Sequence, residues 1–307
     1  MLLMADLEQL LEGSSRTFAL TIPLLPEPIR REVTVAYLLF RVADTLEDSE
    51  RWPPDRRAAG LRAFEALLEA QAGRGPVEAF GQALRDDPPS LAPGYRALTD
   101  ELVAVFDALG ELSPRARQVI IEHLLVTARG MAEGLEAAGD GPFRLRSLAQ
   151  LERYCYLVAG VVGEMLTELF LLASPPLDAA GTTLRQHARS FGEGLQLTNI
   201  LKDAFGDASE ERHFIPEQLS MPALFARARK DLADAARYVS ALVTARAPQG
   251  VVAFTALPVR LALDTLAEVE RRGAGAKVSR EQVAEAMAEV QALLRGERNL
   301  DVVLRSR

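Results

Sequence analysis

Cysteine and histidine are scarce in this chain of 307 residues. Cys155 is its single cysteine, and three histidines stand far apart in the sequence, at His123, His187 and His213. One cysteine excludes an internal disulfide and a cysteine-based zinc site. Scattered histidines argue against a histidine-rich metal centre. The sequence therefore offers no obvious set of sulfur or nitrogen ligands.

Basic residues are also in deficit, and long apolar runs are missing. The chain has 35 Lys and Arg against 43 Asp and Glu, a net charge of −8. An acidic chain disfavours a nucleic-acid partner, but local fields still allow an anionic substrate. The apolar run 155–163 ends at Glu164 and is too short to cross a bilayer. The first six residues lack the basic region of a targeting signal. We expect a cytoplasmic protein, with peripheral membrane contact left open.

Breakers divide the chain into segments rich in good helix formers. They lie at 52–54, 87–89, 92–94, 139–142, 174–176, 247–250 and 272–275. Apolar residues recur at helical spacing in 56–72, 257–266 and 283–294, and no segment alternates like a strand. The run 33–40 would suit a strand alone, but it continues to Asp44 without a breaker. These patterns predict a single all-α domain over residues 1–307.

One narrow polar stripe stands out in the predicted helix 33–48. Tyr37, Arg41, Asp44 and Asp48 fall at i, i+4, i+7 and i+11, which is one helix face. The other faces carry Val, Ala, Leu and Phe. A surface helix would show a broad polar face, so this pattern suggests a buried helix that faces a cavity.

A second stripe follows the same rule in 191–207. Gln196, Asn199, Asp203 and Asp207 share one face among apolar neighbours. If the two helices face each other, four carboxylates surround one space, and two of them about 6 Å apart repel by ~3 kcal/mol. A counter-charge is implied, and oxygen ligands on rigid helices suit Mg²⁺ completed by substrate phosphates.

Simpler interpretations exist for each feature taken alone. The acids after Asp44 would suit a solvated helix end before Pro53, and Lys202 would make an ordinary surface patch with Asp203. The hydroxyls and guanidinium of 14–17 suit a phosphate site, or a helix cap with an ion pair. Arg212 would bind phosphate or pair with Glu210. The two stripes together are harder to explain as surface.

Five separated motifs resemble the squalene and phytoene synthase family over about residues 10 to 280. They are Ser15-Arg16-Thr17-Phe18, Tyr37-x3-Arg41-x2-Asp44-Thr45-Leu46-Glu47-Asp48, Tyr154-Cys155-Tyr156-Leu157-Val158-Ala159-Gly160-x2-Gly163, Gln196-x2-Asn199-x3-Asp203-x3-Asp207 and Arg212-x3-Pro216. The resemblance implies an isoprenoid-synthase-type helical bundle around a central apolar cavity. It also implies two prenyl diphosphates, joined head to head, as substrates.

The resemblance assigns roles to these positions. It implies that Asp44, Asp48, Asp203 and Asp207 bind Mg²⁺, with Glu47 as an auxiliary ligand. The implied diphosphate contacts are Ser15, Arg16, Arg41, Asn199 and Arg212. Tyr37, Tyr154 and Gln196 would lie at the reacting centre, with Tyr154 favoured for proton handling or cation stabilisation. Prenyl chains would pass the small residues Val158, Ala159 and Gly160, although tight helix packing would explain the glycine as well.

Two C-terminal stretches resemble the squalene-forming branch of the family. Phe254-Thr255-Ala256-Leu257-Pro258 is similar to its Phe-x-Ala-Ile-Pro pattern, and Lys277 and Arg280 are similar to basic residues near its nicotinamide phosphate. The resemblance then implies condensation of two farnesyl diphosphates through presqualene diphosphate and reduction by NADPH to squalene. A phytoene or dehydrosqualene synthase without the reductive step, a presqualene diphosphate synthase and a catalytically silent helical scaffold are the alternatives.

Overall fold

Helices make up most of the described part of the chain. The computed structural model describes residues 4–15, 18–139, 143–209 and 213–305, without the side chains of 4–6 and 205–209. Within these residues the only β pairing is an isolated bridge between Arg144 and His213, so the all-α prediction is confirmed. The chain divides into two compact units, Met1–Pro23 with Glu27–Gly141 and Leu24–Pro26 with Pro142–Arg307. The single domain and its central cavity stay predictions.

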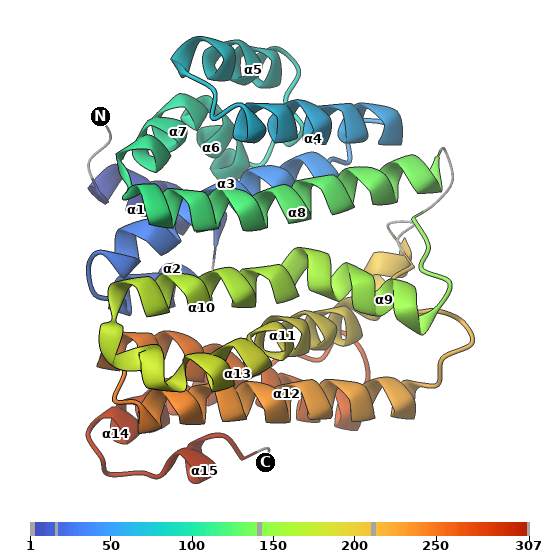
Figure 1. The fold of residues 1–307 in the computed structure, drawn as a ribbon. Helices are drawn as coiled ribbons and strands as arrows, with labels where there is room; N and C mark the ends of the chain where they lie inside the picture. Colours follow the sequence, from blue (N-terminus) through green and yellow to red (C-terminus); the bar gives the residue numbers. More distant parts are fainter. Residues whose placement is uncertain (1–3, 16–17, 140–142, 210–212, 306–307) are drawn as a thin grey trace. The chain divides into compact units, whose positions relative to one another are not determined.

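In the first unit, α3 is the helix around which the others pack. It spans Ile29–Glu47 and contacts α1, α4, α6, α7 and α8. The elements of this unit are α1 (Met4–Ser14), α2 (Phe18–Thr21), η1 (Ile22–Leu24, whose last residue belongs to the second unit), α3, α4 (Pro54–Glu69), α5 (Arg74–Asp86), α6 (Pro93–Asp100), α7 (Leu102–Glu111) and α8 (Pro114–Ala138). Figure 1 shows α4 lying along α8. The run 33–40 is therefore helical, as its continuation predicts.

The breakers mark helix ends because proline suits the first helical turn and glycine suits the residue after the last. Helices α4 and α6 begin at the predicted breakers Pro54 and Pro93, and α8 begins at Pro114, which was not among them. Ser113 caps α8 by accepting a hydrogen bond from the Ala116 N–H (3.2 Å). Gly139 ends that helix with φ of 60°, a backbone conformation that residues with a Cβ rarely adopt.

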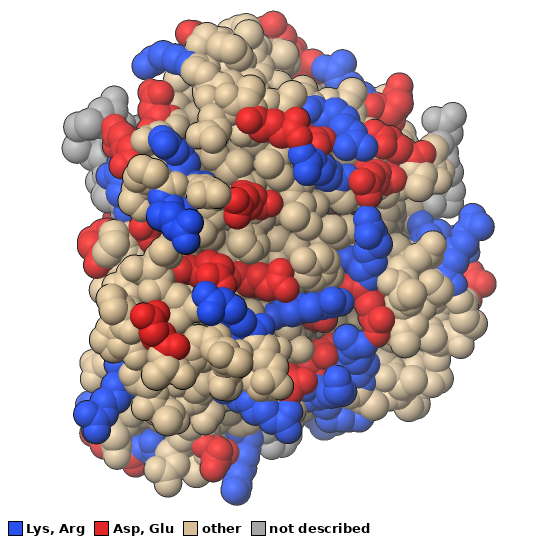
Figure 2. Space-filling view, in the orientation of Figure 1, with Lys and Arg blue, Asp and Glu red and all other residues tan. Residues whose placement is uncertain are grey.

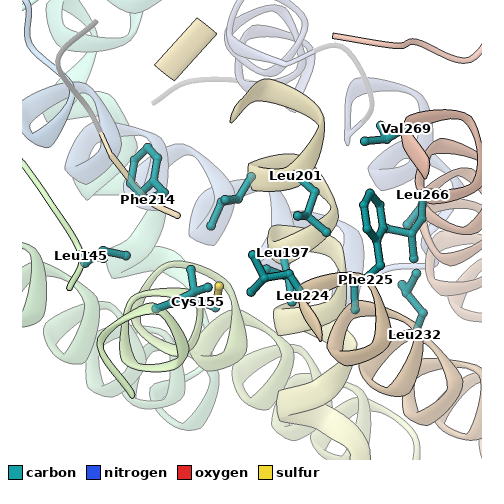
Figure 3. Close-up of a cluster of buried hydrophobic side chains, with 14 of the residues drawn as sticks. Leu145, Cys155, Leu197, Leu201, Phe214, Leu224, Phe225, Leu232, Leu266 and Val269 are labelled. Atoms are coloured by element: carbon teal, nitrogen blue, oxygen red, sulfur yellow. The ribbon is translucent and has the colours of Figure 1, made fainter. Parts of the chain in front are cut away.

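The second unit is built around α11, which spans Gly181–Ser209 and packs against α10, α12 and α13. Its elements are α9 (Leu148–Cys155), η2 (Tyr156–Gly160), α10 (Val161–Ala173), η3 (Pro175–Ala180), α11, α12 (Met221–Thr244), α13 (Gln249–Arg272), α14 (Arg280–Leu294) and α15 (Leu300–Val303). Figure 3 shows part of its core, where Leu197 and Leu201 of α11 meet Leu224 of α12 and Leu266 of α13. Burial of these apolar side chains stabilises the unit.

Two stretches of this unit are long and apolar enough to cross a membrane, Leu148–Ala173 and Gln249–Arg272. In each, well over half of the most apolar window is buried inside the protein (61% and 67%), as in the core helices of soluble proteins. From the apolar run 155–163 alone, the sequence predicts a segment too short to cross a bilayer. The structure corrects this length, because the apolar helical segment runs through α9, η2 and α10.

Acidic and basic side chains lie next to each other on the face drawn in Figure 2, without a wide field of one sign. Many charged side chains of the described residues are paired. Arg62 donates to Glu136 (2.8 Å), and Arg185 donates to Glu168 (2.6 Å). Such exposed pairs contribute about 0–1 kcal/mol each, so they contribute little to folding.

Candidate active site

The structure brings together three of the four polar residues on the predicted face of α3. Arg41 Nη2 donates a hydrogen bond to Tyr37 Oη (2.8 Å), and Arg41 Nη1 lies 3.2 Å from Asp44 Oδ2. The Arg41 guanidinium also lies 5.4 Å from the centroid of the Tyr37 ring. These contacts follow from helical spacing, because residues three and four apart are neighbours. The stripe is a connected row of polar groups.

The surroundings of Asp44 disfavour the charged form of its carboxyl group. Burial raises its pKa to about 6, Arg41 opposes that shift and Asp48 adds to it. The side chain still keeps 33% of its surface exposed, so crowding by protein around the oxygens, rather than full enclosure, causes the shift. A divalent cation would lower this pKa again by favouring the charged form.

Arg41 has one donor to spare. Its Nε is buried and has no hydrogen-bond partner among the described residues. A buried donor without a partner costs about 1–3 kcal/mol, which an anionic ligand would recover. The Tyr95 ring of α6 also lies 5.9 Å from this guanidinium. Sequence spacing could not indicate Tyr95, since only folding brings α6 beside α3.

The end of α3 is partly solvated, as the simpler interpretation suggested. The helix stops at Glu47 and Asp48 is exposed. Glu47 differs from its neighbour because it is buried, at 8% exposed. Its backbone oxygen accepts a hydrogen bond from Arg57 Nη1 (3.0 Å). Asp44 and Asp48 are one turn apart, so both carboxylates lie on the same side of the helix.

The polar cluster near the N-terminus lies beside this stripe. The backbone oxygen of Ser14 accepts a hydrogen bond from Tyr37 Oη (3.3 Å), and the Phe18 ring packs 5.5 Å from that of Tyr37. Ser15 Oγ accepts the Phe18 N–H (3.0 Å), so it caps α2. Capping does not occupy the hydroxyl proton, which stays available to an anion. Arg16 lies outside the described residues.

The α11 stripe is more exposed than the α3 stripe. Gln196 is half-buried, whereas Asn199 and Asp203 are exposed. Lys202 Nζ lies 3.4 Å from Asn199 Oδ1 and 3.2 Å from Asp203 Oδ2. The surface patch that Lys202 suggested therefore exists. A lysine between an amide and a carboxylate also presents a positive charge to an anion. The Asp207 side chain and Arg212 lie outside the described residues.

The loop between α13 and α14 meets α11 at this stripe. The Gly275 N–H donates a hydrogen bond to the Lys202 backbone oxygen (2.6 Å). Gly275 has φ of 85°, a conformation that suits glycine. Lys277 and Arg280 follow in this loop and at the start of α14, and both are exposed. The two predicted cofactor cations thus belong to a segment anchored beside Asp203.

Phe254, the third predicted cofactor residue, lies in the interior of the second unit. It is 2% exposed, and its ring packs edge-on against Phe170 at 6.2 Å. Two buried aromatic rings in this arrangement stabilise a core. Any effect of Phe254 on a bound cofactor would therefore act through the position of α13.

Tyr154 belongs to an aromatic cluster. Its ring lies 4.9 Å from that of Phe214 and 5.7 Å from that of Phe143, and it packs against the core drawn in Figure 3. The side chain is half-buried. The structure therefore gives it a packing role, and its predicted role in proton handling or cation stabilisation stays a prediction.

The helix after Tyr154 contains one π-helical turn, η2, which we call the π-turn. It includes Val158 and Ala159, both half-buried, and ends at the buried Gly160. Single π-turns inside α-helices are rare and frequent at functional sites. A Cβ on Gly192 of α11 would lie 1.9 Å from the Ala159 oxygen, and one on Gly163 would lie 2.0 Å from the Ala188 oxygen. Close packing therefore does explain glycine in this region.

The donor set of the α3 stripe fits magnesium. Among the described residues, no three His, Cys, Asp or Glu side chains gather to bind a metal on their own. Mg²⁺ in substrate sites is usually held by one or two carboxylates, with waters and phosphates completing the octahedron. Asp44 and Asp48 supply two such carboxylates, and a bound cation would favour the charged form of Asp44, whose pKa is raised by burial.

Comparisons with known proteins identify the family to which the chain belongs. The family model "Squalene/phytoene synthase" matches residues 11–220, more than half of the chain. The chain therefore belongs to the squalene/phytoene synthase family. It is 30% identical over 290 residues to the squalene synthase of Schizosaccharomyces pombe (86% of this chain, 59% of that protein). It is 31% identical over 237 residues to the squalene synthase LSS of Botryococcus braunii (74% and 44%).

A solved structure supports the same fold along nearly the whole chain. The complex of TcSQS with the ligand BPH1237 matches with a TM-score of 0.74 and 25% identity, over 98% of this chain and 91% of that one. The chain spans 59% and 44% of the lengths of the two curated relatives named above.

Proposed function

We propose that this protein is a squalene synthase. It would condense two farnesyl diphosphates head to head through presqualene diphosphate and reduce that intermediate to squalene with NADPH. The similarity to squalene synthases over most of the chain carries the proposal. Phytoene- and dehydrosqualene-forming activity receive no comparable support from these relatives.

The described side chains suit the ionisation of a prenyl diphosphate. Magnesium, when bound, would neutralise charge on the leaving diphosphate. Asp44 and Asp48 would hold it, and the spare Nε of Arg41 would donate to a phosphate oxygen. Tyr37 fixes the Arg41 guanidinium through its hydrogen bond (2.8 Å). On α11, Asp203 would bind a further ion, and Asn199 and Lys202 would orient the diphosphate. The predicted Mg²⁺ role of Asp207 and the phosphate roles of Ser15, Arg16 and Arg212 complete the proposal.

The reductive step rests on the segment that follows α13. NADPH, when bound, supplies the hydride. Lys277 and Arg280 are exposed and would pair with its phosphates, and the hydrogen bond from the Gly275 N–H to the Lys202 oxygen anchors the start of their segment to α11. Gln196, Tyr37 and Tyr154 are proposed to line the reacting centre, where an apolar surrounding would exclude water from the allylic cation.

We further propose a cytoplasmic enzyme that touches a membrane surface to release its product. Squalene is wholly apolar, so release into water is unfavourable. Several large apolar side chains are exposed on the second unit, including Leu148, Leu172 and Met221. A membrane surface would cover such side chains during product release.

Product analysis tests the function directly. Purified protein is incubated with farnesyl diphosphate and Mg²⁺, with and without NADPH, and products are identified by mass spectrometry. We expect squalene only with NADPH, and presqualene diphosphate to accumulate without it. An identical product with an extra central double bond under both conditions would contradict the reductive proposal. Presqualene diphosphate under both conditions would identify an enzyme of the first half-reaction.

A further inference from the structure

A network of ion pairs between α9, α11 and α12, which includes the buried carboxylates of Glu193 and Asp231, has no role in the function proposed above. Glu193, 3% exposed, accepts a hydrogen bond from Arg189 Nε (2.7 Å) and lies 3.6 Å from Arg227 Nη2. Arg227 Nε donates to Asp231 Oδ2 (2.8 Å), and Arg227 Nη1 donates to Glu152. Three carboxylates therefore share two guanidinium groups. Burial of the Glu193 and Asp231 carboxylates costs free energy, so their retention suggests a structural or functional role.

The same network reaches the π-turn. The Arg189 guanidinium lies 4.7 Å from the centroid of the Tyr156 ring, close enough for an attractive cation–π contact. Tyr156 Oη donates to Glu164 Oε2 (3.1 Å), which ties the turn to α10. A Cβ on Gly160 would lie 3.2 Å from Glu193 Cγ, so the stem of Glu193 fills the space over the end of the turn.

We propose that Glu193 and Arg189 are positioning residues that hold the π-turn against α11. They would thereby fix where Val158 and Ala159 lie along the bound prenyl chain. The inference rests on the proposed function, since it takes these two small residues as part of the wall of the substrate site. A π-turn holds one more residue than the α-turn it replaces. Relaxation to α-helix would therefore shift and rotate the residues that form the wall.

Replacement of Glu193 leaves the rest of the network paired. Arg227 keeps Asp231 and Glu152 as partners. Burial raises the pKa of Glu193, although Arg189 opposes the shift, so we expect glutamine to be accommodated at this position. Gln at 193 retains an oxygen that accepts the Arg189 N–H, whereas Ala removes both the oxygen and the stem over Gly160. Glu193→Gln therefore tests the charge alone, and the difference between Ala and Gln tests the hydrogen bond together with the stem.

The experiment compares Glu193→Ala, Glu193→Gln and Arg189→Lys with the wild type. Hydrogen exchange of amides 156–161 is measured, together with kcat and KM for farnesyl diphosphate in Mg²⁺. In Glu193→Ala we expect about tenfold faster exchange, and about tenfold higher KM with kcat changed less than about threefold. This split follows because a wall contacts the chain equally in the ground and transition states. Glu193→Gln should restore values near the wild type.

Arg189→Lys and a matched surface pair sharpen the comparison. Lysine keeps the charge but loses the planar stacking on Tyr156, so it should follow Glu193→Ala in exchange. Glu168→Gln is the control, because Glu168 of α10 pairs with Arg185 of α11 (2.6 Å) and neither residue belongs to the network. We expect Glu168→Gln to change neither exchange in 156–161 nor KM.

Each result decides the proposal. Unchanged exchange in both Glu193→Ala and Arg189→Lys would overturn it, whatever the kinetics. Faster exchange with an unchanged KM would overturn the link to the substrate wall. If Glu193→Ala does not fold, Arg189→Lys and Glu193→Gln carry the same comparison. A wild type that forms no prenyl product would refute the proposed function, and hydrogen exchange alone would then decide whether the pair holds the turn.

Discussion

Arg41 shows how neighbours set the use of one side chain. Its guanidinium is shared between Tyr37 and Asp44, and its remaining buried Nε has no partner among the described residues. A plain surface ion pair would leave no such donor buried, since water would satisfy it. The arrangement therefore fits a residue that is held in place by two contacts and completes its hydrogen bonds with a ligand.

Asp44 is the residue whose loss should be felt most in catalysis. We expect Asp44→Asn to lower kcat/KM at least about a hundredfold, because an amide binds Mg²⁺ far more weakly than a carboxylate. Circular dichroism should show unchanged helix content, and Asp203→Asn should behave alike. The matched control is Asp107→Asn, since Asp107 pairs with the exposed Arg74 (3.4 Å) on the surface. Full activity in Asp44→Asn would contradict the magnesium site.

Glu32 leads to a second prediction, about pH and stability. It is 6% exposed in the first turn of α3, and its Oε2 has no hydrogen-bond partner among the described residues. Burial, with the charge of Glu27, raises its pKa. The folded state therefore binds this proton more tightly than the unfolded state, and stability falls as the pH rises above the unfolded value. Glu32→Gln removes that loss.

The expected gain depends on pH in a defined direction. Glu32→Gln should match the wild type near pH 4.5 and be more stable than the wild type at pH 8. Urea unfolding at both pH values measures the difference. The exposed Glu12→Gln on α1 is the control and should show no such trend. A gain that is equal at both pH values would contradict the buried-charge explanation.

Single-residue inference from the sequence worked where neighbours are near in the chain. Helical spacing was enough to pair Arg41 with Tyr37 and Asp44, and to place Lys202 beside Asp203. It missed Tyr95 and the Glu193–Arg227 pair, because those contacts join helices that only tertiary packing brings together. Phe254 shows a further limit, since an apolar residue in a motif also serves the core.

At the scale of helices, the π-turn can pack closely against α11 because Gly192 has no side chain at the point of contact. We expect Gly192→Ala to destabilise the protein by about 1–3 kcal/mol or more, because overpacking costs this much. Its Cβ would lie 1.9 Å from the Ala159 backbone oxygen, which has no flexible side chain to move aside. Chemical denaturation measures the loss.

Gly110→Ala is the matched control for that prediction. Gly110 lies in α7, is exposed, and has no other described atom within 4 Å of the position that a Cβ would take. Alanine should there stabilise the helix by up to about 1 kcal/mol, since glycine is the poorer helix former. Opposite signs for the two substitutions support a steric explanation. Equal losses would point to a general need for glycine instead.

Helix positions were largely predictable because proline, glycine and serine act locally. The starts of α4 and α6 and the C-terminal end of α8 coincide with predicted breakers in the sequence. The π-turn was not predicted, since one extra residue in a helical turn leaves the apolar pattern of α9 and α10 almost unchanged. Its position is set by packing against α11, where Gly163 and Gly192 allow close approach.

At the scale of the whole protein, fold class follows from the sequence more directly than the reaction does. Proline and glycine breakers between helix-forming segments, with an ordinary apolar content, are enough to predict an all-α fold. Five motifs far apart in the chain carry the resemblance to the family, and the match of the family model to residues 11–220 confirms that membership. The family match covers residues 11–220, whereas Lys277 and Arg280, on which the proposed reduction depends, lie beyond that range. Condensation and reduction would therefore rest on different segments of the protein and be separable by mutation.

Ligand binding should stabilise the whole protein only when metal and diphosphate are both present. Any ligand that binds the folded state alone raises stability, by about 2.7 kcal/mol at a hundred times its Kd. For a chain of this size that corresponds to a rise in Tm of about 4 °C. We expect this rise with Mg²⁺ plus a farnesyl diphosphate analogue in which sulfur replaces the oxygen between the farnesyl carbon and the diphosphate. Mg²⁺ alone should have little effect, because two or three carboxylates are too few ligands. In Asp44→Asn the rise should vanish while Asp107→Asn retains it, and an equal rise in both would show that the analogue binds elsewhere.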